Sequence, residues 1–327
     1  MKVMNLKSLN SPSILSKIIS EKAVALGFSA CGFAKAEAVN QLHTTAFKKW
    51  IDNGFNHNMK YMENYIEKRL NPSLLMPNAK SIICVALNYF PCKQIPENQY
   101  SIASYALGKD YHVVLKNMLH QLAKSCGFVP YSNENSDKST VNYLAFCDTA
   151  PILERYWAQK AGLGWIGRNK NLILKHGGNF FFLGELLIDT ELVYSQECRS
   201  RCGKCSACQD ACPTKALQNN FDCKLCLSYQ TIENRGAIPQ TLHPFLKNTI
   251  YGCDICIKVC PYNKFSTPTN IDDFLPSDTL LQMTQSDWHN LTQEKYQQLF
   301  KGSAVKRAKF VGLMRNISIA KENINTR

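Results

Sequence analysis

Apolar residues in the first half of the chain change from helical to strand-like spacing and back. Residues 13–26 carry apolar side chains at helical intervals after a Ser-Pro start, and Gly27 is typical of a helix end. The run 81–89 has the length and β-branched content of a buried strand, whereas 110–125 again has helical spacing. This alternation predicts an α/β or α+β domain over about residues 1–190.

The same reasoning predicts the elements from residue 151 onwards. Residues 151–161 predict a helix that starts with a proline, and the glycine-rich stretch 162–167 follows it. The apolar runs 172–175 and 180–188 are joined by His-Gly-Gly-Asn, which predicts a hairpin between them. Segment 278–327 is predicted to be helical and is strongly basic.

The glycine-rich stretch, Gly-Leu-Gly-Trp-Ile-Gly, matches the G-x-G-x-x-G pattern of dinucleotide-binding folds. That fingerprint must follow a strand and open a helix, so that pyrophosphate meets a helix N-terminus. Here a predicted helix precedes the glycines and a predicted strand follows them. We therefore expect the glycines to let the backbone approach a flat cofactor or a substrate closely.

Composition narrows the class of protein. The chain has 327 residues, with 38 Lys and Arg against 25 Asp and Glu and a formal charge of +13. That length allows two or three domains, and the charge favours a polyanionic partner, although a basic background composition would give the same balance. No run of about eighteen apolar residues and no signal-peptide core occurs, so we expect a protein that is neither membrane-bound nor exported.

The fifteen cysteines argue for metal or redox use, because thiols in a reducing compartment rarely form structural disulfides. Ten of them gather within residues 198–260. Five others are scattered earlier in the chain, and we expect them to be small buried hydrophobic residues. These five are Cys31, Cys84, Cys92, Cys126 and Cys147.

Two cysteine runs have iron–sulfur spacing. Residues 202–213 read C-x2-C-x2-C-x3-C-P, the bacterial ferredoxin pattern, in which three thiolates bind one [4Fe–4S] cluster and the fourth binds another. Residues 253–261 repeat the last three positions, with the first cysteine displaced upstream. Zinc also binds C-x2-C pairs, but a zinc site needs no reciprocal C-x3-C-P, so this pattern favours iron–sulfur clusters over zinc. Cys198 lies outside both runs and is predicted to be a spare thiol. One cluster is assigned to Cys202, Cys205, Cys208 and Cys260. The other is assigned to Cys212, Cys253 and Cys256, with either Cys223 or Cys226.

Two polar residues carry open alternatives. Asp148 precedes the helix predicted at 151–161, where it is either a helix cap or a carboxyl whose pKa burial raises until it can donate a proton. Asp110-x-His112 begins the D-x-H-x-x-G motif of cobalamin-ligating histidines, but Leu115 replaces the glycine. A lone histidine in a helix is more often packed or solvated, so the motif alone does not establish the cofactor.

In this order, the motifs resemble the epoxyqueuosine reductase (QueG) family, whose members complete queuosine in tRNA. The C-x-S-Y-x-T-I-E element of that family favours Cys226 over Cys223 as the displaced cluster ligand. The resemblance is carried by DTAPILER at 148–155, AGLGWIGRN at 161–169, FFFLGELL at 180–187, CLSYQTIENRG at 226–236, GCDICIKVCPYN at 252–263 and GSAVKRAKFVGLMRN at 302–316.

The resemblance implies an α+β protein in three parts. These are a cobalamin-binding α/β domain over 1–194, a ferredoxin-like domain with two [4Fe–4S] clusters over 195–265, and a short helical, basic segment over 266–327. Longer members extend this last part into a helical-repeat tail. The implied activity is oxidoreduction: two electrons pass singly through the clusters to cobalamin and remove the epoxide oxygen at the tRNA wobble base.

The family motifs also imply roles for individual residues. Asp148 would be the acid that protonates the departing oxygen, and cobalamin would be bound without a histidine ligand from the protein. Arg69 and Asn169 could equally be surface or capping residues, and a charged helix face is usually only solvated. The implied cobalamin contacts are Arg69, Tyr105, His112, Asp148, Asn169 and Ser228. The implied tRNA contacts are Lys306, Arg307 and Arg315.

Two other functions would also account for part of this sequence. A cobalamin-dependent reductive dehalogenase shares the cofactor but acts on small organohalides and is commonly exported, whereas this chain is basic and shows no export signal. A plain two-cluster electron carrier would leave most of the chain before the cysteine runs without chemistry. We expect a cytoplasmic monomer that acts on tRNA and takes electrons from a reductant protein or a small electron donor, without a membrane.

Overall fold

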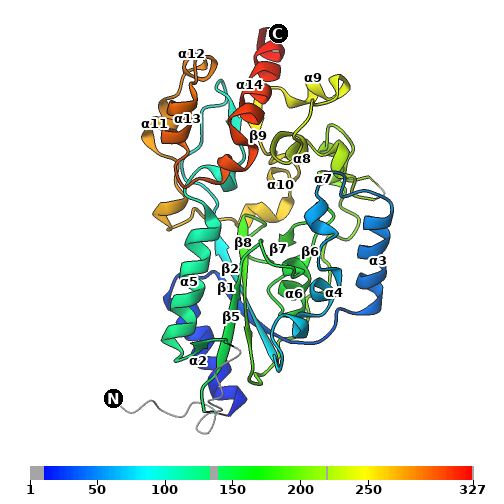
Figure 1. Cartoon of the computed structure of the whole chain (residues 1–327), viewed down its shortest axis with the longest axis vertical. Coiled ribbons are helices and arrows are strands. Elements are labelled where there is room, and N and C mark those ends of the chain that lie inside the picture. The colour runs from blue at the N-terminus through cyan, green and yellow to red at the C-terminus, as the bar shows by residue number, and fades with distance from the viewer. Residues whose placement is uncertain (1–10, 133–138, 219, 326–327) are drawn as a thin grey trace. The chain divides into compact units, whose positions relative to one another are not determined.

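The computed structural model describes residues 11–132, 139–218 and 220–325 (Figure 1). Its chain divides into two compact units that interleave along the sequence. Among the described residues, unit 1 comprises the stretches up to Phe47, Asn64–Asn88 and His112–Gly203, and unit 2 comprises Lys48–Glu63, Tyr89–Tyr111 and the stretch from Lys204. The units therefore cut across the three consecutive parts predicted, because two early segments join the C-terminal unit.

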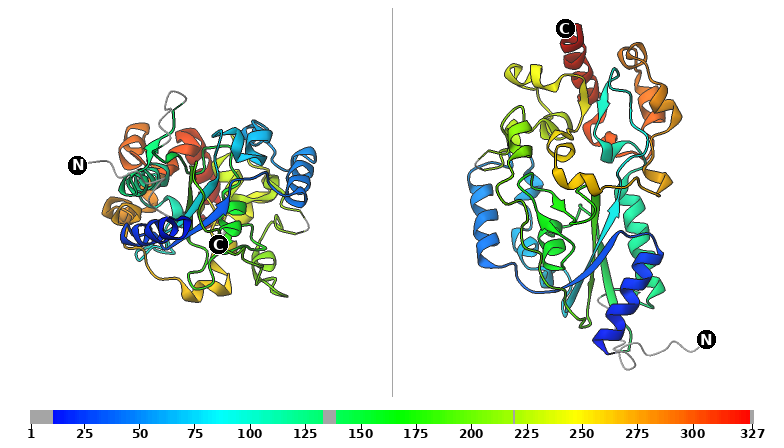
Figure 2. Two further views of the ribbon diagram at one scale, coloured as in Figure 1. Left: turned by 90° about the horizontal axis from the view of Figure 1, so that it is seen from below. Right: turned by 180° about the vertical axis from the view of Figure 1, so that it is seen from behind.

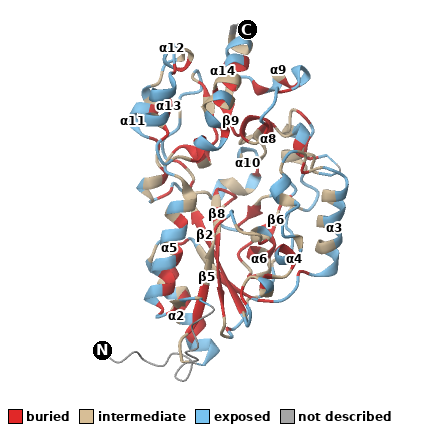
Figure 3. Cartoon of the chain, in the orientation of Figure 1, coloured by how far each residue is buried: buried red, intermediate tan, exposed pale blue. Residues whose placement is uncertain are grey.

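Unit 1 is built on a five-stranded mixed sheet with the strand order β1-β2-β8-β5-β4. The neighbours from β1 to β5 are antiparallel, and β4 adds parallel to β5. Strand β2 is buried almost throughout and β8 over most of its length, as expected for apolar runs covered on both faces (Figure 3). The strands are β1 (Ala30–Lys35), β2 (Ser81–Asn88), β4 (Val129–Pro130), β5 (Asn142–Phe146) and β8 (Phe181–Ile188).

Helices cover both faces of this sheet (Figure 2). Helices α2 (Pro12–Ala25) and α5 (Tyr111–Ser125) lie on one face, and α6 (Glu154–Lys160) packs on β1, β2 and β8 from the other. A Cβ added at Gly184 would lie only 3.0 Å from a methyl of Leu119, so the glycine admits α5 closely. The shorter helices α3 (Gln41–Asp52) and α4 (Ile66–Leu70) complete the N-terminal elements.

The hairpin predicted between 172–175 and 180–188 is wrong. Strand β7 (Leu172–Ile173) pairs with β6 (Trp165–Ile166) in a separate two-stranded sheet, and β8 crosses the centre of the large sheet. Leu174 and Gly178 form an isolated bridge. The physical reason is that a strand that is apolar on both faces needs a neighbour along each edge, and a two-residue strand cannot provide one.

Unit 2 consists of helices, most of them short, around a two-stranded parallel sheet. Its C-terminal helices enclose a core that includes Trp288, Tyr296 and Phe300, which confirms the helical prediction for the described part of 278–327. No helix in the described ranges is both long and apolar enough to span a membrane. The elements are β3 (Ser101–Ile102), β9 (Thr249–Tyr251), α7 (Ala207–Ala211), α8 (Leu227–Ile232), α9 (His243–Leu246), α10 (Ile255–Lys258), α11 (Asp278–Gln282), α12 (Gln285–His289), α13 (Gln293–Leu299) and α14 (Lys309–Asn325).

The scattered cysteines are mostly, but not all, buried. Cys84, Cys126 and Cys147 are buried, as predicted, and Cys31 is half-buried. Cys92 is exposed, so the prediction is wrong there. Its loop follows the end of β2, beyond the covered part of the sheet.

Candidate active site and iron–sulfur ligands

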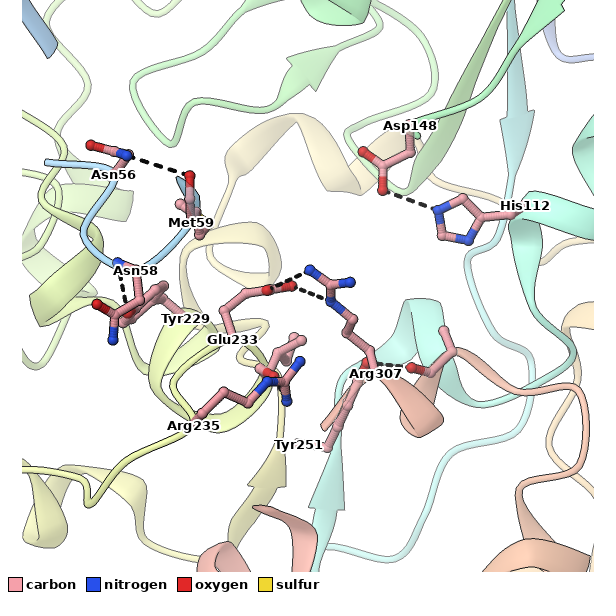
Figure 4. Close-up of polar contacts among 12 residues, drawn as sticks. Asn56, Asn58, Met59, His112, Asp148, Tyr229, Glu233, Arg235, Tyr251 and Arg307 are labelled. Atoms are coloured by element: carbon pink, nitrogen blue, oxygen red, sulfur yellow. Dashed lines mark hydrogen bonds and ion pairs between the residues drawn. The ribbon is translucent and has the colours of Figure 1, made fainter. Parts of the chain in front are cut away.

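Asp148 lies in the loop between β5 and α6, with its backbone in the left-handed region at a φ of 57°. Such a conformation costs a non-glycine residue about 1 kcal/mol or more, so neighbouring contacts must hold it. Its Oδ2 lies 3.2 Å from Nε2 of His112, the second residue of α5 (Figure 4). The N-cap of α6 is Leu153, so Asp148 does not cap this helix. The structure thus directs the carboxyl towards a histidine.

Glu154, the first residue of α6, holds the backbone of the Asp148 loop. Its Oε1 accepts a hydrogen bond from the N–H of Asp148. Burial raises the pKa of the Glu154 carboxyl to about 8, and the negative charge of Asp148 adds to the rise, while Arg155 and His112 oppose it. Sequence reasoning missed this role, because an acidic residue in a first helical turn is common as a partner of the helix dipole.

Glu185 is a second unpredicted carboxyl beneath the same loop. It lies in β8 with no exposed surface, opposite Cys84 of β2 on one side and Phe146 of β5 on the other. No described group donates a hydrogen bond to either of its oxygens. Burial raises its pKa well above the ordinary value, and Glu154 adds to the rise. A buried carboxyl in these surroundings is stable when it is neutral.

The glycine-rich stretch packs against the chain itself. A Cβ at Gly164 would lie 2.1 Å from the carbonyl oxygen of Ile173, and one at Gly162 would lie 2.7 Å from that of Gln196. These close approaches show that packing within the chain itself already requires glycine at both positions. Helix α6 precedes the glycines, the short strand β6 lies among them and strand β7 follows, so the predicted order of elements, which does not fit a dinucleotide fingerprint, is confirmed.

Helix α6 links the Asp148 loop to the residues that follow the glycines. Nη1 of Arg155 donates a hydrogen bond of 2.6 Å to the carbonyl oxygen of Lys170. Next to it, Asn169 is buried and its Oδ1 accepts from the N–H of Asn171 at 3.1 Å. Asn169 therefore has a local turn-forming role, whatever else it contacts.

The six predicted cobalamin contacts divide between the two units. Arg69, buried in α4, belongs to unit 1 together with His112, Asp148 and Asn169, and the structure brings His112 and Asp148 together. The other two predicted contacts belong to unit 2.

In unit 2, the hydroxyl of Tyr105 donates to the hydroxyl of Tyr251 at 3.1 Å. Ser228 lies at the start of α8, where its backbone N–H and that of Tyr229 lower the pKa of Cys226 against the larger, raising effect of burial. Ser228 is therefore positioned by the cysteine that precedes it by two residues.

Cys202 belongs to unit 1, and the two cysteine runs from Cys205 onwards lie in unit 2. Helix α7, which contains Cys208, packs against α10, which contains Cys256. No disulfide involves any of the eight predicted ligands. Among the described residues, no group of three His, Cys, Asp or Glu side chains is arranged to hold a single metal ion. Quartets of soft thiolates are the donor set that [4Fe–4S] clusters take.

The quartet assigned to the second cluster gathers around common neighbours. Burial raises the pKa of Cys253 to about 12, and negative charges on Cys226 and Cys212 add to the rise. Burial likewise raises the pKa of Cys256, with further contributions from Cys253, Cys226 and Cys212. Cys226 is therefore close to the other three. Cys223 is buried, and its backbone N–H donates to the carbonyl oxygen of Phe55.

The predicted tRNA contacts have different surroundings. Arg307 forms a two-point ion pair with Glu233, with distances of 2.9 Å from Nε and 2.7 Å from Nη2 (Figure 4). Arg315 donates to the backbone carbonyls of Gln230 and Asn234 at 2.7 and 2.8 Å. These internal bonds argue against a phosphate contact for Arg315. Lys306 is exposed.

This α+β fold, with paired cysteine runs and an acid-bearing loop, defines an iron–sulfur oxidoreductase. The family model described as "4Fe-4S double cluster binding domain" matches residues 201–263, and "Epoxyqueuosine reductase QueG, DUF1730" matches 69–149. The chain is 41% identical to the epoxyqueuosine reductase of Cellulophaga algicola, over 96% of this chain and 100% of that protein. It is 35% identical to that of Escherichia coli, over 94% and 81%. The chain belongs to the epoxyqueuosine reductase family.

Solved structures agree with this fold. The epoxyqueuosine reductase of Streptococcus thermophilus superposes with a TM-score of 0.80 and 29% identity, covering 94% of this chain and 81% of that one. A crystal structure of an epoxyqueuosine reductase with an epoxyqueuosine-modified tRNA stem loop gives a TM-score of 0.84 at 24% identity, over the same shares. The predicted α+β class is confirmed.

Proposed function

We propose that this protein is an epoxyqueuosine reductase, which removes the epoxide oxygen from epoxyqueuosine at the tRNA wobble position to give queuosine. The observation that carries the proposal is the occurrence, in one chain of this family, of a double-cluster domain and a loop that presents Asp148 to His112. One relative was crystallised with an epoxyqueuosine-modified tRNA stem loop. A structure of the Bacillus subtilis enzyme has its catalytic aspartate loop swung out of the active site.

The reaction sets demands that this chain can meet. Conversion of an epoxide to an alkene consumes two electrons and two protons and releases water. The cysteine quartets would hold two clusters that pass single electrons, and cobalamin, when bound, would supply the two-electron chemistry between the clusters and the substrate. Asp148 protonates the departing oxygen, because an alkoxide is a poor leaving group.

The cluster ligands follow from the crossed pattern of the two cysteine runs. Because ferredoxin-type runs lend their last cysteine to the partner cluster, each quartet includes one residue of the other run. One cluster is held by Cys202, Cys205, Cys208 and Cys260. The other is held by Cys212, Cys226, Cys253 and Cys256.

Cobalamin would be held by polar and charged side chains of this chain. Nε2 of His112 faces the Asp148 carboxyl, so this nitrogen is engaged within the protein. Arg69, His112 and Asn169 of unit 1 are the contacts proposed there, and Tyr105 and Ser228 of unit 2 are proposed as further contacts.

The proposed partners are tRNA and a reductant protein or small electron donor, and the protein acts as a monomer in the cytoplasm. The exposed Lys306 is the proposed phosphate contact at the C-terminal end. A reductive dehalogenase or a plain electron carrier is not favoured, because the relatives that match almost the whole chain are epoxyqueuosine reductases.

The test is turnover by anaerobically reconstituted protein. The holoenzyme, supplied with a chemical reductant and an epoxyqueuosine-modified stem loop, should yield a nucleoside lighter by one oxygen in mass spectrometry. Asp148→Asn should keep its iron and cobalamin content but turn over at least about 100-fold more slowly, because it removes the general acid. Asp52→Asn, at an exposed helix end, should behave like the unmodified protein. Absence of product from the unmodified holoenzyme would reject the function, and unimpaired turnover by Asp148→Asn would reject the acid assignment.

A further inference from the structure

Three carboxyl groups gather around the turn between β5 and α6. Glu185 is opposite Phe146, the last residue of β5, in the sheet register, so their side chains share a face. That face is the one covered by α6, whose first residue is Glu154. Glu154 in turn accepts the N–H of Asp148. A continuous path therefore leads from the centre of the sheet to the backbone of the proposed acid.

The acidic side chains along this path are not matched by an equal number of cations. Asp148 faces His112, and the guanidinium of Arg155 donates to the carbonyl oxygen of Lys170. Glu185 has Cys84 as its cross-strand neighbour on β2 and accepts no hydrogen bond from the described residues. The buried carboxyl of Glu185 and the half-buried carboxyl of Glu154, without a cation between them, cannot both ionise, as in other paired-carboxyl sites.

We propose that Glu154, supported by Glu185, is a positioning residue for Asp148. In its neutral form, Glu154 accepts the hydrogen bond from the Asp148 N–H and so holds the Asp148 loop in place. We call this restraint the latch. The inference rests on the proposed function only in naming Asp148 as the acid. In this role, Glu154 acts through the backbone of its neighbour, whose N–H it accepts. The left-handed conformation of Asp148 needs such a restraint, because the loop would relax without it.

The latch should open as the pH rises. The pKa of Glu154 is raised to about 8, with burial as the main cause. Negative charge on Asp148 opposes ionisation, whereas the hydrogen bond from the Asp148 N–H, Arg155 and His112 favour it. Because the pKa in the folded protein lies above that of an exposed carboxyl, the stabilisation is fully present at low pH and is lost as the pH rises through about 8. Above that pH, an ionised Glu154 repels the carboxylate of Asp148.

Hydrogen exchange tests the latch directly. In the reconstituted holoenzyme, the amide of Asp148 should be protected at pH 7, and its protection, corrected for intrinsic exchange, should fall at least 10-fold between pH 7 and 9. Glu154→Gln keeps an acceptor oxygen but cannot ionise, so it should retain protection at pH 9. Glu154→Ala removes the acceptor and should lose protection at every pH. Glu191→Gln, on an exposed loop of unit 1, is the matched control and should follow the unmodified protein.

Turnover supplies the second readout. Glu154→Ala should lower kcat about 10-fold or more at pH 7 while changing KM for the stem loop less than about twofold, because a positioning residue acts on the geometry of the acid and not on binding of the stem loop. Glu154→Gln should stay within about threefold of the unmodified kcat at pH 7. Undiminished protection of the Asp148 amide in Glu154→Ala, or the same loss between pH 7 and 9 in Glu154→Gln as in the unmodified protein, would overturn the inference. Since exchange is measured without turnover, these results are independent of whether the holoenzyme reduces epoxyqueuosine.

Discussion

Arg315 shows why a residue's charge does not reveal what its side chain binds. In sequence it belongs to a basic helical segment, which indicates a phosphate contact. In the structure its guanidinium donates to the backbone carbonyls of Gln230, Asn234 and Gly236. Those carbonyls lie some eighty residues away along the chain, so no local pattern could have predicted the bonds. Lys306, from the same segment, is exposed and has the surroundings that a phosphate contact needs.

Arg315→Ala should therefore act on stability. The substitution leaves three carbonyls without a charged donor, and hydrogen bonds to charged groups are worth about 1.5–3 kcal/mol each. We expect Tm to fall by several degrees in thermal unfolding of the holoenzyme, with an unchanged salt dependence of tRNA binding. Lys306→Ala should leave Tm within about 1 °C and reduce the slope of log Kd against log salt concentration by about 1, because one phosphate contact is lost. A reduced salt slope with an unchanged Tm in Arg315→Ala would instead assign it to tRNA.

At the scale of elements, the sequence predicted which segments form strands and helices better than which strands pair. Helix α5 and strand β2 lie within one residue of their predicted bounds. Strand β8 was also predicted, but its partner was not. Alternation and length are properties of a segment itself, whereas pairing depends on neighbours such as β2 and β5, which are distant along the chain. Within β8, the carboxyl of Glu185 in an otherwise apolar strand was a local sign of an unusual position.

Gly32 controls how closely β1 approaches α6, the helix that carries Glu154. A Cβ at this position would lie 2.0 Å from the carbonyl oxygen of Ala161, where α6 ends. Gly32→Ala should therefore push the helix away from the sheet and destabilise the protein by about 1–3 kcal/mol, seen as a lower Tm and a lower kcat. Gly236→Ala is the control, because its Cβ would meet its nearest atom, Oδ1 of Asn234, at 3.6 Å. Equal Tm values for the two variants would mean that α6 is not held as tightly as this contact requires.

For the whole molecule, the cysteine spacing predicted the kind of cofactor, but not every ligand. Ferredoxin-type spacing can be recognised in the sequence without knowledge of the fold. The displaced ligand could not be assigned from spacing, because Cys223 and Cys226 are equally placed in sequence. The fold separates them, since Cys226 lies near Cys212, Cys253 and Cys256. The interleaving of the two units was unpredictable for a similar reason: membership of a unit depends on contacts between distant segments.

Iron content should report this assignment. Anaerobically reconstituted protein should hold about eight irons per chain, because two [4Fe–4S] clusters are expected. Cys226→Ser should reduce that number towards four and alter the cluster signals in electron paramagnetic resonance, since the second quartet loses a thiolate. Cys223→Ser is the matched control, three residues away and buried, and should keep about eight irons. An iron content near four per chain in the unmodified protein, or an equal loss of iron in both variants, would contradict the crossed ligand pattern. The proposed reduction would then lack the two clusters that supply it with single electrons.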